Sequence, residues 1–129
     1  MTPTGPSTRL RIAPSAASAP VARTVVRRLL DDAGVDTEVR QTAELLATEL
    51  VSNAVEHGGG SSYLDAVVGP DAVRLEVTDP NPALPTPSPS LDDLDERGRG
   101  LLLIAALASR WGAERHPPGK TVWCEIALA

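Results

Sequence analysis

A proline-rich segment in the second half of the chain limits most strongly how this sequence can fold. Residues 80–96 contain five prolines and four acidic residues. Because proline fixes φ and lacks a backbone N–H donor, neither a core helix nor a central strand can run through this segment. Loops of this length in a compact domain are usually functional lids or disordered. We therefore expect a lid at about residues 80–99, with regular elements before and after it.

Before the lid, the spacing of apolar residues predicts a strand, two helices and a hairpin. The expected elements are an edge strand at residues 8–12, helices at residues 19–33 and 37–57, and strands at residues 62–68 and 72–78. Thr37 is expected to cap the second helix. An arc of about 100° of that helix is apolar and should face the core. Glu49 and Asn53 lie one turn apart just outside this arc, at its boundary with solvent.

After the lid, the pattern predicts one helix and two strands. Residues 98–100 read Gly-Arg-Gly and lead into an apolar helix that ends near residue 109, and strands follow at residues 111–115 and 121–128. Hairpins require antiparallel pairing, and helices with one apolar stripe need a sheet face to cover. We expect an α+β fold, a two-layer α/β sandwich whose mixed, mainly antiparallel sheet is covered on one face by three helices. Residues 1–7 are expected to be a disordered tail, and residues 8–129 a single domain.

The composition excludes several kinds of partner. The formal net charge is −5, and the chain has two Trp, one Tyr and no Phe. A nucleic-acid partner is therefore not expected, because duplex binders are basic and single-strand binders stack bases on aromatic rings. No apolar run approaches the roughly 18 to 20 residues that span a bilayer, so no membrane association is expected. The single cysteine fits a reducing compartment, and we expect a cytoplasmic protein.

Three groups of residues, in a fixed order, indicate a nucleotide site. Asn53 offers a neutral hard oxygen of the kind that binds Mg²⁺, with Glu49 one turn before it. Asp79 ends a strand, where its carboxylate can accept a hydrogen bond from an exocyclic amine such as that of adenine. Gly98 and Gly100 precede a helix, and backbone N–H groups at a helix N-terminus approach phosphate oxygens favourably.

Four segments resemble the motifs of one protein family. They are residues 49–57, 75–79, 96–101 and 119–122. In this order they are similar to the N box, the adenine-binding strand, the glycine motif after the lid and the last strand of the Bergerat-type (GHKL) histidine-kinase-like ATPases. Within that family the chain resembles the small stand-alone anti-sigma-factor serine/threonine kinases, over about residues 10–128. The resemblance implies a Bergerat ATP-binding fold with ATP and Mg²⁺ as cofactors.

The resemblance also implies roles for individual residues. Asn53 would be the Mg²⁺ ligand, Glu49 the base that orients or activates the attacking hydroxyl, and Asp79 the adenine contact. Gly98 and Gly100 would hold the triphosphate. The other residues that the resemblance assigns to the nucleotide site are Asn81, Arg97, Arg99, Leu101 and Thr121.

Three of these residues need comment. Thr121 is expected to support the adenine site together with Asp79. Asn81 replaces the glycine that the family usually has after the aspartate, and asparagine tolerates the positive φ of such a turn. Either Arg97 or Arg99 is expected to meet the γ-phosphate, and the sequence does not select between them.

The function implied by the resemblance is an ATP-dependent protein serine/threonine kinase. It would phosphorylate a small anti-sigma antagonist and regulate a sigma factor by partner switching, with the antagonist, the sigma factor or both as protein partners and a homodimer as an open alternative. A second interpretation is an ATP-dependent protein-binding module without kinase turnover. A third is a plain α/β domain that binds no nucleotide.

Overall fold

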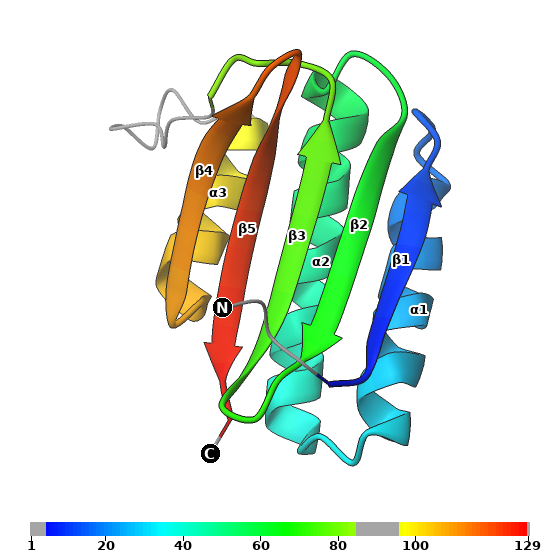
Figure 1. Ribbon diagram of the computed structural model, residues 1–129, viewed down its shortest axis with the longest axis vertical. Coiled ribbons are helices and arrows are strands. Elements are labelled where there is room, and N and C mark those ends of the chain that lie inside the picture. The colour runs from blue at the N-terminus through cyan, green and yellow to red at the C-terminus, as the bar shows by residue number, and fades with distance from the viewer. Residues whose placement is uncertain (1–4, 85–95, 129) are drawn as a thin grey trace.

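A five-stranded sheet forms one layer of the protein in the computed structural model, which describes residues 5–84 and 96–128 (Figure 1). The strands are β1 (Ser7–Ile12), β2 (Ser62–Val68), β3 (Ala72–Asp79), β4 (Arg110–His116) and β5 (Gly119–Ala127). Their order in the sheet is β1-β2-β3-β5-β4, and each of these neighbouring pairs is antiparallel. The expected mixed sheet is therefore corrected to a wholly antiparallel one among the described strands.

Three helices form the second layer and cover one face of the sheet (Figure 1). They are α1 (Ser18–Asp32), α2 (Thr37–His57) and α3 (Glu96–Leu107). In Figure 1, α1 lies behind β1, α2 behind the centre of the sheet and α3 behind β4 and β5. The prediction of a two-layer α+β sandwich with three helices on one face is confirmed. None of the described helices is long and apolar enough to cross a membrane.

The aliphatic core lies between these layers. In the expected apolar arc of α2, Ala43, Leu46, Ala47, Leu50 and Ala54 are buried and Val39 is half-buried. Leu46 and Leu50 are among the largest fully buried side chains. In β3 every second side chain is buried, beginning with Val73. Side chains of a strand alternate between the two faces of its sheet, so this row faces the helices.

The ends of the first two helices are set by particular residues. Gly34 follows α1 with φ of +72°, a conformation that favours glycine, and its N–H donates to the carbonyl of Asp31. The α2 cap differs from the expectation, because the side chain of Asp36, not Thr37, accepts a hydrogen bond from the N–H of Glu38. Thr37 is the first residue of the helix.

The segment boundaries around the expected tail and lid also differ. Ser7 belongs to β1, so the ordered part of the chain begins before residue 8. The third helix begins at Glu96, and Gly98 and Gly100 therefore lie within its first turns instead of in a loop ahead of it. Residues 1–4 of the expected tail and residues 85–95 of the expected lid lie outside the described residues.

The sheet face away from the helices carries charged and aromatic side chains. Arg74 lies over the Trp123 ring, with its guanidinium carbon 4.2 Å from the ring centroid. The same guanidinium forms ion pairs with Glu76 and Glu125, at 2.7 and 3.0 Å. The charges of Arg74, Glu76 and Glu125 are thus paired within the sheet.

Candidate functional site

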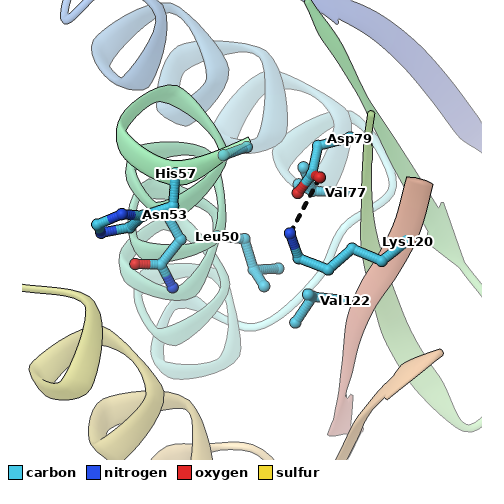
Figure 2. A pocket seen from close by; sticks show the side chains of 8 residues that line it. Leu50, Asn53, His57, Val77, Asp79, Lys120 and Val122 are labelled. Carbon is cyan, nitrogen blue, oxygen red and sulfur yellow. Dashed lines mark hydrogen bonds and ion pairs between the residues drawn. The ribbon is translucent and has the colours of Figure 1, made fainter. Parts of the chain in front are cut away.

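A small cavity lies between α2 and the neighbouring strands β3 and β5 (Figure 2). Its volume is about 20 Å³, which is room for about one water molecule. Leu50 of α2, Val77 of β3 and Val122 of β5 supply apolar walls. The polar residues at the cavity are Asn53 and His57 of α2, Asp79 of β3 and Lys120 of β5.

Two opposite charges meet inside this cavity. Lys120 Nζ lies 3.0 Å from Asp79 Oδ1, and the two side chains are only 5% and 4% exposed (Figure 2). The same ammonium donates to the carbonyl oxygen of Asn81 at 3.0 Å. Asp79 Oδ1 also accepts the backbone N–H of Asn81 at 2.9 Å. The buried charges are thus both paired and hydrogen-bonded, as burial requires.

Strand register places Asp79 and Lys120 side by side. They are directly opposite each other in the β3–β5 pairing, two residues beyond the opposed pair Val77 and Val122. Residues two apart in a strand share a face, so both charged side chains extend the apolar rows that face the helices. The carboxylate of Asp79, which the sequence predicted as a site residue, therefore lies buried under α2.

Thr121 does not reach this cavity. Its hydroxyl oxygen lies 2.9 Å from that of Thr78, its partner in the β3–β5 register. Both threonines point to the face away from the helices, because they alternate with Asp79 and Lys120. The expectation that Thr121 supports Asp79 is therefore corrected, and Lys120 occupies the place next to the carboxylate.

Lys120 is the residue that the sequence reasoning missed. Its signal was present in the alternation of the last strand, where the apolar residues Val122, Cys124 and Ile126 are all buried. Extending this row backward by two residues reaches Lys120, not Thr121. Lys120 continues the buried row of β5 and Asp79 continues that of β3, and the two residues are opposite each other. This arrangement predicts a buried ion pair.

Asn53 lies across the cavity from this pair (Figure 2). The side chain is half-buried, and within residues 5–84 and 96–128 no hydrogen bond engages its amide. Its oxygen is thus available to a ligand. Glu49 is half-buried one turn earlier on α2 and lies outside the lining of the cavity. The structure brings Asn53 and Asp79 to one cavity and sets Glu49 beside it.

Asn81 forms hydrogen bonds that hold the chain in place just after β3. Its Nδ2 donates to the carbonyl of His57 at 2.7 Å, and its Oδ1 accepts the N–H of Ala83 at 3.0 Å. No described residue other than glycine has a positive φ, so Asn81 does not use the left-handed conformation that its place in the family suggested. Its contribution is a set of hydrogen bonds that tie the start of the expected lid to the end of α2.

The remaining expected site residues belong to α3. Leu101 is 0% exposed and packs in the core, which makes it a structural residue of the helix start. Gly98 lies in the first turn of α3, where backbone N–H groups have no partner within the helix, and Gly100 lies in the second turn. The assignment of a phosphate to Arg97 or Arg99 stays a prediction.

Comparison with known proteins adds independent information. Residues 12–126 match the family model described as histidine kinase-like ATPase domain. An uncharacterized protein of Streptomyces coelicolor, SCO4941, is 36% identical over 84 residues, which is 62% of this chain and 80% of that protein.

Two solved structures share the fold. The first, the RsbU and RsbW domains of Rv1364c from Mycobacterium tuberculosis, matches 95% of this chain with a TM-score of 0.74 and 22% identity. The second, the histidine kinase domain of the blue-light activated histidine kinase EL346 from Erythrobacter litoralis, matches 88% with a TM-score of 0.53 and 18% identity. This chain spans 32% of the mycobacterial chain and 60% of the Erythrobacter chain.

These matches agree with the architecture described above. The family model covers nearly all of the described residues, including α2, β3 and β5, which form the cavity. The two solved structures share this fold at low sequence identity. On this evidence the chain belongs to the histidine kinase-like ATPase domain family.

Proposed function

We propose that this protein binds Mg²⁺-ATP in the cavity beneath α2 and uses it as an anti-sigma-factor-type serine/threonine protein kinase. The observation that carries the proposal is the buried Asp79 carboxylate at the end of an apolar cavity, with the Asn53 amide on the opposite wall. Ligand sites of this kind combine apolar walls with a few convergent polar groups. The phosphorylated protein would be a small anti-sigma antagonist.

The residues fit the base of ATP in their chemistry. A purine is flat and apolar on its faces, which suits walls made by Leu50, Val77 and Val122. Its exocyclic amine is a donor, and the Asp79 carboxylate is an acceptor. Hydrogen bonds to a charged group contribute roughly 1.5–3 kcal/mol, so Asp79 would supply much of the preference for adenine.

The phosphate end is assigned to α2 and α3. Asn53 would contribute an oxygen ligand to Mg²⁺, which when bound neutralises charge on the phosphates. The first turn of α3, which contains Gly98, would donate backbone N–H groups to phosphate oxygens, and Gly100 would leave space beside them because it has no side chain. Glu49, one turn before Asn53, would accept the proton of the attacking serine or threonine hydroxyl.

Substitution of Glu49 separates kinase activity from nucleotide binding alone. Transfer of labelled γ-phosphate from ATP to purified candidate antagonist proteins is measured for the wild type and for Glu49→Ala, and binding of Mg²⁺-ATP is measured by calorimetry. A positioned general base contributes typically about 10²- to 10⁴-fold, so transfer should fall by at least about a hundredfold while ATP affinity is retained. Glu38→Ala, which removes an exposed carboxylate from the same helix, is the control.

The outcomes distinguish the two interpretations left open by the sequence. Equal transfer by the wild type and Glu49→Ala would remove Glu49 from the chemistry. ATP-dependent binding of an antagonist by the wild type, without transfer, would make the protein a nucleotide-dependent binding module.

A further inference from the structure

The ammonium of Lys120 is bound to the carboxylate that the proposed site assigns to the nucleotide base. It lies 3.0 Å from Asp79 Oδ1, the carboxylate assigned to the base, and its side chain lines the cavity between α2 and the sheet (Figure 2). The space left is about 20 Å³, whereas pockets for small molecules measure about 300–1,000 Å³. A base therefore cannot enter while Lys120 stays on Asp79.

We propose that Lys120 is an internal plug that competes with the nucleotide base for Asp79. The base enters only when the Lys120 side chain leaves the cavity, and the ion pair keeps the site closed in the absence of ligand. This inference rests on the proposed nucleotide site and describes its regulation.

The side chain, not the strand, is the part that can move. Asp79 and Lys120 are opposed in the β3–β5 ladder, and their neighbour Gly119 is so close that an added Cβ would overlap the Asp79 carbonyl. The backbones of β3 and β5 are thus in direct contact, and separating them would cost their ladder hydrogen bonds. A lysine stem, by contrast, has four rotatable bonds and a charged end that water solvates well.

Departure of Lys120 would also change the segment that follows β3. Its ammonium holds the carbonyl oxygen of Asn81 at 3.0 Å, while the Asn81 amide stays bonded to the carbonyl of His57. When Lys120 leaves, its hydrogen bond to the Asn81 carbonyl is lost, whereas the hydrogen bond from the Asn81 side chain to His57 remains. Entry of the base would therefore change the position of Asn81, which follows Pro80 at the start of the expected lid.

Substitution of Lys120 tests the competition. Mg²⁺-ATP is titrated into the wild type, Lys120→Met and Lys120→Gln in a calorimeter, with folding checked by circular dichroism. A ligand that no longer has to break the ion pair should bind at least about tenfold more tightly to both variants. Arg23→Gln removes a positive charge from an exposed position on α1 and should bind as the wild type does.

A second measurement needs no substitution, because Lys120 is the only lysine in the sequence. An amine-reactive acetylating reagent is added to the wild type, and modification of Lys120 is followed by peptide mass spectrometry. Labelling should be slow in the free protein and several-fold faster with saturating Mg²⁺-ATP, because the ammonium moves into solvent. The α-amino group of the same chain is the internal control. This measurement decides the question if the Lys120 variants fail to fold.

The binding and labelling measurements distinguish the plug from the nucleotide site. Tighter binding to the Lys120 variants, or faster labelling with nucleotide, supports the plug. Unchanged or weaker binding to folded variants, or unchanged or slower labelling with nucleotide, means that Lys120 contacts the ligand or is uninvolved, and the plug is overturned while the nucleotide site stands. Absence of Mg²⁺-ATP binding in the wild type and in folded variants overturns the nucleotide site itself, and the plug with it.

Discussion

Asp79 and Lys120 are opposite charges that the fold removes almost completely from water, with side-chain exposures of 4% and 5%. Removing one partner of a buried ion pair leaves an uncompensated charge and costs about 3–5 kcal/mol, whereas replacing both partners costs much less. We therefore expect Asp79→Asn and Lys120→Met each to lower the free energy of unfolding by an amount in this range. The double variant should be destabilised by much less than the sum.

Urea unfolding of the four proteins gives the coupling energy between the two residues. The surface pair Arg9 and Asp65 is the matched control, since its atoms are 3.4 Å apart but its side chains are 63% and 33% exposed. Its coupling energy should be about 1 kcal/mol or less. Additive effects at Asp79 and Lys120 would contradict the buried pair.

The start of α2 depends on which residue caps the helix. Asp36 accepts the N–H of Glu38 at 3.4 Å, whereas Thr37 is the first residue of the helix. Loss of an N-cap side chain costs about 0.5–2 kcal/mol, and the long hydrogen bond favours the lower part of that range for Asp36→Ala. Thr37→Ala should cost little or nothing, because alanine has the higher helix propensity. Thermal unfolding of both variants measures the difference, and the reverse order of stability would restore Thr37 as the cap.

The elements themselves were largely predictable from the sequence. The strand at residues 62–68 was predicted with the bounds that the structure has, and the helix at residues 37–57 likewise. Both follow from the spacing of apolar residues, which depends only on the local chain. The start of α3 was not predicted, because Gly98 and Gly100 are poor helix formers and their place in the first turns of the helix depends on the packing of Leu101 and Ile104.

The candidate site was predictable only in part. Asn53 and Asp79 lie at one cavity, as the order of motifs suggested. The contact between Asp79 and Lys120 joins residues 41 positions apart, and it depends on the register between two strands. The role expected for Thr121 came from the resemblance, whereas the alternation along β5 puts Lys120, not Thr121, in the buried row.

For the whole molecule, burial of Cys124 predicts a loss of stability at alkaline pH. Burial raises the pKa of the Cys124 thiol from 9.0 to about 12 in the folded protein. Between these values the unfolded chain carries a thiolate and the folded chain a neutral thiol, so the unfolded state binds fewer protons. The free energy of unfolding should therefore fall as pH rises through this window, by up to about 1.4 kcal/mol per pH unit.

Urea unfolding of the wild type and Cys124→Ala is measured at about pH 8 and about pH 10.5. All other titratable groups are present in both proteins, so the difference between them gives the contribution of the Cys124 thiol. The wild type should lose more stability than the variant between the two pH values. Parallel losses would show that the thiol does not stay neutral in the folded state.

In the proposed site the cavity beneath α2 takes the base of Mg²⁺-ATP and Asn53 binds the metal ion. Calorimetric titration of Mg²⁺-ATP into the wild type and Asn53→Ala tests both assignments. The wild type should bind at a single saturable site, and binding should weaken when Mg²⁺ is chelated. Asn53→Ala should keep the stability of the wild type, because alanine favours the helix, and should lose the Mg²⁺-dependent part of the affinity. A wild type without saturable binding would contradict the nucleotide site, and an Asn53→Ala variant that binds Mg²⁺-ATP as the wild type does would contradict the role of Asn53.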